Sequence, residues 1–414
     1  MLLRSKLVEV LRSNLCSGCG ACYSICSANA INMRVALDGT YKPFIDPHKC
    51  TKCGLCERVC PSLSGTPKAK IKGLGNFINC YIGYSTDTKI RWEASSGGVV
   101  TTILLSLFEE GLISGAVIVK KDPKDSLKPS MILTNSKEDI IEAMGSKYCP
   151  AKPSFRVKDL VNVQGKVAIV GLPCHIWAFR NLEKIDKRLK DKILIHLGLF
   201  CGKKPNFYAT VYFIRKIVGV NEREVVEISY RGKGWPGKLT VMTKRGESYS
   251  FELGDWISFS YYPHFIPIRC VFCYDITNQQ ADISLGDAWG LAHDNIGTSV
   301  IITRTPVGEN IIQYLHKTGK LVLREVDPKQ VSQGQGLEDK VSNTLIRAYI
   351  WRRIFHKPTP YELSYPPQFS LKEWVLNLGY CLWLYVTQNK FIRATLCNLN
   401  PLVSEAVRWI RWMH

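Results

Sequence analysis

From residue 80 onward, two kinds of apolar pattern alternate along the chain. Short apolar runs rich in β-branched residues are expected to be strands, and they cover residues 80–85, 115–119, 166–171, 192–200, 225–230, 281–285 and 299–303. Between them, apolar residues recur every three or four positions, as in 99–110 and 207–218, which predicts amphipathic helices. Such alternation predicts an α/β or α+β core built on a mixed sheet.

Length and charge place only weak limits on the number of domains and on the partners of the chain. A chain of 414 residues allows more than one core, since single cores rarely exceed about 250–300 residues. Its formal charge of +20 suits an anionic membrane surface or a polyanionic cofactor tail, or it is simply a well-solvated basic surface. No nucleic-acid reading motif is present, so nucleic acid is not expected as a partner. Residues 1–14 lack the apolar core of a secretory signal, which favours a cytoplasmic setting.

The cysteines carry the strongest chemical signal. Eight of the sixteen form the run C-x2-C-x2-C-x3-C twice, and Pro61 follows the second run, the pattern of two [4Fe-4S] clusters in which each fourth cysteine binds the neighbouring cluster. Cluster 1 is expected to use Cys16, Cys19, Cys22 and Cys60, and cluster 2 to use Cys50, Cys53, Cys56 and Cys26. Zinc is the alternative, but zinc sites usually close with two pairs of ligands.

A second group of cysteines follows predicted strands in the larger unit. Cys174 ends the run Gly-Leu-Pro-Cys, Cys201 lies in Phe-Cys-Gly, and Cys270 and Cys273 form a C-x2-C pair. The ends of neighbouring strands converge in space, so a third [4Fe-4S] cluster is predicted there, with zinc or plain buried thiols as alternatives. The other four cysteines are expected to pack in the interior, and they are Cys80, Cys149, Cys381 and Cys397.

The run Ser95, Ser96, Gly97 and Gly98 stands directly before the predicted helix 99–110. Free amides at a helix start favour phosphate, and an ordinary N-cap is the alternative. Neither G-x-G-x-x-G after a strand nor a nucleotide-hydrolysing phosphate loop is present, so nucleotide hydrolysis is not expected.

Taken together, these motifs resemble the coenzyme F420 hydrogenase/dehydrogenase beta-subunit family, in the version with an N-terminal two-cluster ferredoxin domain. The resemblance spans roughly residues 16–305, and its segments are 95–101, 145–148, 170–174, 200–202, 270–273 and 281–290. It implies an FAD-binding subunit in which flavin exchanges a hydride with a deazaflavin and single electrons with iron–sulfur clusters. The third cluster would be the one nearest the flavin.

The resemblance also implies roles for single residues. Ser95, Ser96, Gly97 and Gly98 would face the FAD pyrophosphate, and Lys147 would bond a flavin carbonyl or a phosphate, a solvated surface lysine being the alternative. Asp287 and Trp289 would line the cofactor pocket, or else cap a turn and fill the core. Lys203 and Lys204, which follow Cys201, depart from the family pattern and suggest a different anionic substrate tail. No catalytic residue is assigned.

The expected fold class is α+β, in four parts. These are a bacterial-type two-cluster ferredoxin fold (1–65), a linker (66–79), a larger mixed α/β domain holding FAD and iron–sulfur (80–335) and a helical, aromatic and basic tail (336–414). Residues 374–389 lack charge but are shorter than the roughly 20 residues of a membrane span. Residues 402–413 have the composition of an interfacial helix, predicting peripheral contact with the inner membrane face or a partner subunit, or else a helical cap.

The predicted function is an iron–sulfur flavoprotein oxidoreductase. It would pass electrons, in either direction, between a hydride carrier such as reduced coenzyme F420 and a one-electron acceptor, with a redox protein or hydrogenase- or dehydrogenase-type subunits as partners. Two alternatives stay open. One is a reductase of an organic intermediate in a biosynthetic pathway, for example of a surface polysaccharide, and the other is a non-catalytic electron-relay subunit.

Overall fold

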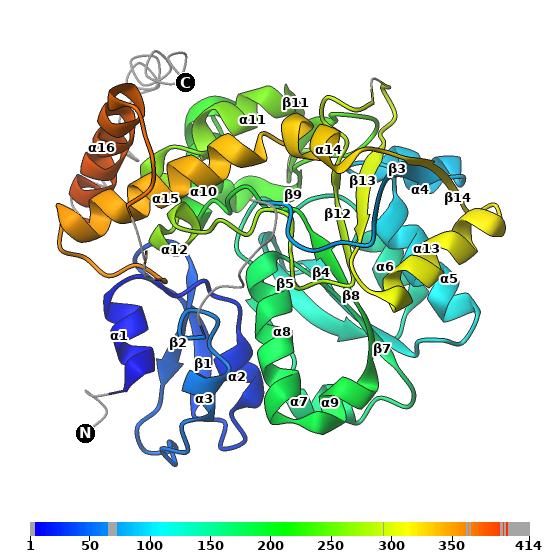
Figure 1. Cartoon of the computed structure of the whole chain (residues 1–414), viewed down its shortest axis with the longest axis horizontal. Helices are drawn as coiled ribbons and strands as arrows, with labels where there is room; N and C mark the ends of the chain where they lie inside the picture. The colour runs from blue at the N-terminus through cyan, green and yellow to red at the C-terminus, as the bar shows by residue number, and fades with distance from the viewer. Residues whose placement is uncertain are drawn as a thin grey trace.

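The computed structural model of the chain describes residues 5–64, 73–292, 294–361, 363, 366–389, 392 and 395. Its N-terminal part, which we call the ferredoxin module (residues 5–64), forms a small lobe beside the rest of the molecule (Figure 1). The module consists of helices α1 (Lys6–Arg12), α2 (Ala21–Ile25) and α3 (Leu55–Arg58) and the antiparallel hairpin β1 (Ile31–Val35) and β2 (Tyr41–Ile45).

A nine-stranded mixed sheet forms the centre of the larger unit. Its strand order is β14-β3-β13-β12-β8-β7-β4-β5-β6. The strands are β3 (Asn79–Ser85), β4 (Gly115–Asp122), β5 (Asp125–Thr134), β6 (Lys152–Pro153), β7 (Val167–Gly171), β8 (Ile193–Leu199), β12 (Ile283–Asp287), β13 (Ser299–Thr303) and β14 (Leu321–Glu325). The inner strands β12, β8, β7 and β4 run parallel, whereas both edges are largely antiparallel.

Helices cover both faces of this sheet. One face packs against α5 (Val99–Glu109), α6 (Lys137–Glu142) and α13 (Pro306–Lys317). The other packs against α7 (Val157–Val161), α8 (Pro173–Ile185) and α9 (Lys187–Lys192), and this second core also takes in Ala21 and Val59 of the ferredoxin module. Because side chains alternate between the faces of a strand, Ala168 belongs to the first core and its neighbours Val167 and Ile169 to the second.

A smaller antiparallel sheet, in the order β11-β10-β9, lies beside the large one. It consists of β9 (Val225–Ser229), β10 (Lys238–Thr243) and β11 (Ser248–Glu252), and it packs with α10 (Phe207–Tyr212), the π-helix Phe213–Val218 and α11 (Leu253–Ser260). Shorter elements in this unit are α4 (Thr88–Glu93), α12 (Ile268–Val271), α14 (Pro328–Gly334) and the 3₁₀ turns Glu222–Glu224 and Pro263–Phe265.

The helices α15 (Leu337–Arg353) and α16 (Leu371–Val386) belong to the predicted tail. They share one apolar cluster with α12 and with Val10 and Leu15 of the ferredoxin module, so this part of the tail is packed against the other parts (Figure 1). Among the described residues, no helix is long and apolar enough to cross a membrane. The segment 402–413, proposed as an interfacial helix, and Cys397 lie outside the described residues.

All seven predicted strand segments are strands, and the large mixed sheet is confirmed. The segment 225–230, however, joins the smaller sheet, and the helix expected over 207–218 changes to π geometry at Phe213. Of the predicted linker, only 73–79 is described, and there Leu74 is fully buried and its carbonyl accepts a hydrogen bond from Thr277. The division into four parts stays a prediction.

Candidate functional site

Each half of the ferredoxin module positions its cysteines by the same local device. The residue before α2 is Gly20 and the residue before α3 is Gly54, and both adopt left-handed backbone conformations, with φ of 80° and 75°. Glycine adopts this conformation without the strain that a side chain would bring, so the chain turns sharply from a loop of ligands into a helix. A cysteine loop followed by a short helix therefore occurs twice.

The four cysteines predicted for cluster 1 come together. Cys16, Cys19, Cys22 and Cys60 line one enclosed cavity with Leu7, Met33 and the small residues beside them. The pKa of Cys16 is raised to about 11 and that of Cys19 to about 12, chiefly by burial and in smaller part by neighbouring thiols, Cys60 among them. Four soft sulfur donors around a closed apolar cavity fit an iron–sulfur cluster, whose formation must displace their protons.

The cysteines predicted for cluster 2 lie nearer the solvent. Cys53 is exposed, whereas Cys26, Cys50 and Cys56 are partly buried. Burial raises the pKa of Cys56 to about 11, helped by Glu57 and then by Cys53 and Cys50. Cys26 packs in the same small apolar cluster as Cys22, Cys56 and Cys60, so cysteines predicted for both clusters meet there.

The third set of cysteines is assembled from three separate segments of the larger unit. Cys174 is in the first turn of α8 after β7, Cys201 follows β8, and Cys270 belongs to α12, three residues before Cys273. Burial raises the pKa of Cys201 well above its usual value, and the thiols of Cys270, Cys174 and Cys273 raise it further. The structure thus brings together four thiols that are up to about 100 residues apart.

The first and third sets are neighbours. After burial, the largest influence on the pKa of Cys19 is the thiol of Cys174, from the other side of the module boundary. We call this boundary around Cys19 and Cys174 the cluster junction. Within the described ranges, no three His, Cys, Asp or Glu side chains are placed to hold a metal ion. A site for a single metal ion needs its ligands close together around one atom. In a [4Fe-4S] cubane each thiolate binds a different iron, so the four thiols are spaced more widely, as in these two sets.

The turn Ser95 to Gly98 connects several loops. Ser95 accepts hydrogen bonds from the backbone N–H (2.7 Å) and the hydroxyl of Ser146. Ser96 donates to the carbonyl of Thr298 at 2.9 Å. Gly97 lies so close to Gly83 that an added Cβ would meet the Gly83 carbonyl oxygen at 2.6 Å. Neither serine caps α5, whose N-cap residue is Gly98 without a side-chain hydrogen bond. The first amides of α5 are therefore left without a side-chain cap.

Asp287 ends β12 and forms an ion pair with the buried side chain of Arg231, while the carboxylate itself is partly buried. Two hydrogen bonds of 2.8 and 2.9 Å join the carboxylate to the guanidinium, and the indole N–H of Trp235 donates to the same carboxylate at 2.9 Å. Burial alone would lower the pKa of Arg231, but the charge of Asp287, together with Tyr148 and the hydrogen bonds to both, outweighs burial and raises it. Trp289 is 38% exposed and its ring centroid lies 4.5 Å from that of Trp235. Asp287 does not cap a turn, and Trp289 does not fill the core.

Lys147 points toward the end of α6. Its ammonium donates to the carbonyls of Ala143, Met144 and Gly145, the last two at 3.0 Å. Burial lowers the pKa of Lys147 to about 7, and the nearby Lys121 charge adds to the effect. The ammonium is therefore not a solvated surface group, and its role in cofactor binding stays a prediction.

Sequence reasoning missed two of these side chains, Arg231 and Trp235. Both lie in the glycine-rich run 230–237, where Gly234 donates its N–H to the carbonyl of Trp92 and Trp235 donates its backbone N–H to the carbonyl of Asn295. The run therefore connects α4, which precedes the Ser95 turn, with the loop after β12. Several glycines directly after a predicted strand were the signal that could have revealed it.

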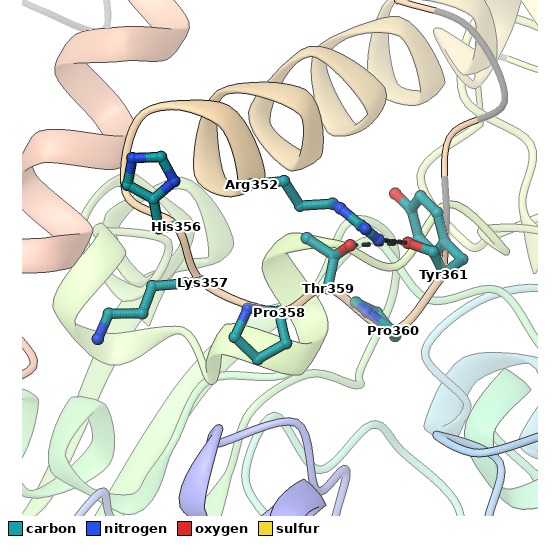
Figure 2. Close-up of a pocket in the computed structure, with 7 residues that line it drawn as sticks. All are labelled: Arg352, His356, Lys357, Pro358, Thr359, Pro360 and Tyr361. Carbon is teal, nitrogen blue, oxygen red and sulfur yellow. Dashed lines mark hydrogen bonds between the residues drawn. The ribbon is translucent and has the colours of Figure 1, made fainter.

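A cavity of about 640 Å³ opens beside the loop that follows α15 (Figure 2). Its lining residues are Arg352, His356, Lys357, Pro358, Thr359, Pro360 and Tyr361. In Figure 2, Arg352 and Thr359 both approach the backbone carbonyl of Tyr361, while His356 and Lys357 point elsewhere. The cations do not converge, so we do not assign a cofactor to this cavity.

Comparison with known proteins gives a consistent picture. Residues 15–63 match the family model "4Fe-4S dicluster domain". Residues 80–157 and 164–329 match the N-terminal and C-terminal models of "Coenzyme F420 hydrogenase/dehydrogenase, beta subunit". The chain is 28% identical to a subunit of the F420H2 dehydrogenase of Methanosarcina mazei over 335 residues, which cover 78% of this chain and 88% of that protein.

Two further relatives share the same region. Coenzyme F420 hydrogenase subunit beta of Methanothermobacter thermautotrophicus is 27% identical, and the match covers 70% of this chain and 99% of that protein. Among solved structures, a chain of the F420-reducing [NiFe] hydrogenase complex of Methanosarcina barkeri superimposes with a TM-score of 0.55 at 22% identity, covering 72% of this chain and all of that one. At this identity the likeness establishes the fold alone.

Proposed function

Since the chain belongs to the coenzyme F420 hydrogenase/dehydrogenase beta-subunit family, with an N-terminal 4Fe-4S dicluster domain, we propose that it is an FAD-dependent iron–sulfur oxidoreductase. In this proposal, electrons pass between a hydride carrier, reduced coenzyme F420 or a similar molecule, and a one-electron acceptor. FAD, when bound, supplies the conversion between hydride transfer and single-electron transfer.

The neighbouring positions of Cys19 and Cys174 are the observation that carries the proposal. They support a path in which the third cluster is nearest the flavin, cluster 1 lies next to it, and cluster 2, with the exposed Cys53, is nearest the partner. Each cluster exchanges one electron at a time, so three clusters in this order suit a chain that joins a two-electron donor to a one-electron acceptor.

The site around the Ser95 turn has the properties that FAD requires. The uncapped amides at the start of α5 and the positive end of its dipole would receive a pyrophosphate. Exposed Trp289 and its neighbour Trp235 would offer an apolar surface to a flat ring. The ion pair of Arg231 and Asp287 would hold that surface in place, since Asp287 fixes both the arginine and the Trp235 indole.

Metal and flavin counts on the anaerobically purified chain test this function. About twelve irons, with matching sulfide, and one FAD per chain are expected, and reduced coenzyme F420 should bleach the flavin and then reduce a viologen dye. A chain that holds its clusters but no flavin would be a relay subunit. Flavin that is reoxidised by an organic substrate instead would support a biosynthetic reductase. A colourless chain would contradict all three functions.

A matched pair of cysteine variants tests the third cluster. Cys174→Ser should lower the iron content by about four per chain, because a cubane that lacks one of four ligands is lost. Cys149→Ala is the control: its thiol is also buried, with a pKa raised to about 12 by burial, yet no other thiol influences it. This control should keep its full iron content. Equal iron in the two variants would remove the third cluster from the proposal.

A further inference from the structure

Lys204 is a buried lysine at the cluster junction. It lies three residues after Cys201, in the loop between β8 and α10, and its side chain is only 8% exposed. Its ammonium donates a hydrogen bond of 3.0 Å to the carbonyl of Ser17, which stands between Cys16 and Cys19. A cationic side chain of the larger unit thus contacts the first ligand loop of the ferredoxin module. Lys204 is thus paired within the protein, and the different anionic substrate tail suggested for Lys203 and Lys204 stays a prediction.

The ammonium of Lys204 faces thiols on both sides of the junction. Burial lowers its pKa, but Cys174, Cys270 and Cys201 of the third set and Cys19 of the first set outweigh burial, so that the pKa is raised overall. In the same way, after the large effect of burial, Lys204 is the strongest influence that lowers the pKa of Cys174. Lys204 is therefore close to both proposed clusters.

Arg269 supplies a second buried cation at the same place. It lies on α12 next to Cys270 and is 5% exposed. Its charge opposes the effect of burial on the pKa of Cys60, from cluster 1, and on the pKa of Cys273, from the third set. Its Nε has no hydrogen-bond partner within the described part of the chain. Two cations thus stand between two sets of sulfur ligands.

Buried cations are costly unless anionic groups compensate them. Thiolate-ligated cubanes are such groups, and their negative charge grows by one when they are reduced. A fixed positive charge nearby therefore favours the reduced form of a cluster, and it does so more strongly in a buried region than in water. Cluster 2, whose Cys53 is exposed, lies outside this environment, because neither Lys204 nor Arg269 is among the influences on Cys56.

We propose that Lys204, together with Arg269, raises the reduction potentials of cluster 1 and the third cluster above the values that these clusters would otherwise have, and leaves cluster 2 nearly unaffected. Electrons that leave the flavin would then be held at the junction before they pass to the outer cluster. Lys204 is a positioning residue in this role, since its tie to Ser17 also fixes the distance between the two ligand loops. The inference rests on the proposed function.

The test is an anaerobic redox titration of the full-length holoprotein, followed by electron paramagnetic resonance. In Lys204→Met, which keeps the length of the side chain but removes its charge, two of the three midpoint potentials should fall and the third should stay. Lys203→Met is the matched control, because it removes the same charge from the neighbouring position, where the ammonium lies 5.0 Å from the ring centroid of Tyr380 on α16. A Cys53→Ser background identifies the signal of cluster 2.

Unchanged potentials in Lys204→Met, or an equal shift in all three clusters, would overturn the inference. If Lys204→Met does not retain its iron, Lys204→Arg decides: retention of iron with potentials near those of the parent protein supports a role of the charge, and loss of iron from both variants contradicts it. Failure of the proposed function looks different, because the parent protein itself would then lack flavin or one third of its iron.

Discussion

The two halves of the ferredoxin module have nearly the same sequence pattern but different surroundings. An added Cβ on Gly20, in the inner half, would lie 2.3 Å from the side chain of Pro153 on β6, whereas nothing lies within 4 Å of the corresponding position on Gly54. Gly18 has Lys52 as its counterpart, and both residues adopt positive φ, 71° and 59°. The inner half is part of a packed interface, and the outer half faces solvent.

This difference shows that the duplicated cysteine motif does not by itself determine the surroundings of each cluster. The ligand spacing determines how each half wraps a cluster, but contacts with the larger unit determine which cluster connects inward. In the inner half, the backbone at Gly18 and Gly20 lies directly against Tyr41 and Pro153. In the outer half a lysine can occupy a position where the inner half has glycine, because its side chain reaches solvent. Because one cluster is buried against the larger unit and the other is near solvent, the two clusters of the module have an inner and an outer end.

The largest effect should come from Gly20→Ala compared with Gly54→Ala. Both variants place alanine in a left-handed conformation, which costs about 1 kcal/mol. Gly20→Ala also forces an overlap with Pro153, adding about 1–3 kcal/mol. The urea midpoint for loss of visible cluster absorbance should therefore fall much further for Gly20→Ala. Equal midpoints would mean that the inner half is not packed against β6.

The next largest difference in stability is expected between Arg156→Ala, which removes contacts to the inner half, and Arg34→Ala, on the hairpin. Arg156 lies over the ring of Tyr23 at 3.7 Å and donates to the Tyr23 carbonyl at 2.5 Å, which ties α7 to the end of α2. Arg156→Ala should destabilise the module by about 2 kcal/mol, since it removes a charged hydrogen bond and a cation–π contact. The control Arg34→Ala, whose guanidinium lies 4.3 Å from the Phe44 ring on the exposed hairpin, should cost less than about 1 kcal/mol.

Removal of iron by a chelator should proceed in two phases. Cluster 2, with the exposed Cys53, should lose its iron about ten times faster than the two clusters at the junction, a difference of about 1.4 kcal/mol in barrier. About four irons per chain belong in the fast phase. Iron release followed by stopped-flow absorbance checks this, and a single phase for all iron would remove the distinction between outer and inner clusters.

The smallest expected effect is a gain in the stability of the ferredoxin module. Lys52→Gly replaces a side chain at positive φ with glycine and should stabilise the module by about 0.5 kcal/mol, the relief of strain being partly offset by the greater freedom of glycine in the unfolded chain. Gly18→Ala at the matching inner position should destabilise it, because its Cβ would lie 2.7 Å from the Tyr41 carbonyl oxygen. Urea midpoints of the two variants should move in opposite directions.

Local pattern was enough to predict much of this molecule. The apolar runs predicted strands such as β7 and β8 because buried parallel strands read as continuous apolar segments. The same reasoning missed β5 and β14, whose polar and half-exposed residues lack that pattern. Ligand spacing predicted the four cysteines that line the cavity of cluster 1, and the assignment of ligands to clusters stays a prediction. The spacing gave no information on the order of the clusters, since Cys19 and Cys174 meet only through packing of α2 against α8.

Lys204 and Arg231 show a second limit of sequence reasoning. Both are charged residues in loops, and a charged loop residue is ordinarily exposed. Their partners, the Ser17 carbonyl and the Asp287 carboxylate, come from segments far away in the chain. The glycines around Arg231 indicate a loop of unusual geometry, but only the folded arrangement shows that the side chains of Lys204 and Arg231 are buried and paired.

Strand β3 lies between β14 and β13, near one edge of the large sheet. It is the first strand of its unit to be synthesised, yet both of its neighbours are the last, with Tyr81 opposite Ile301 on one side and Glu325 on the other. On the ribosome, one hydrogen-bonding edge of β3 therefore stays unpaired until β13 has emerged at residue 303, and the other stays unpaired until residue 325, whereas the ferredoxin module has all its ligands by residue 60. Translation thus separates an early step of cofactor assembly from a late closure of the sheet.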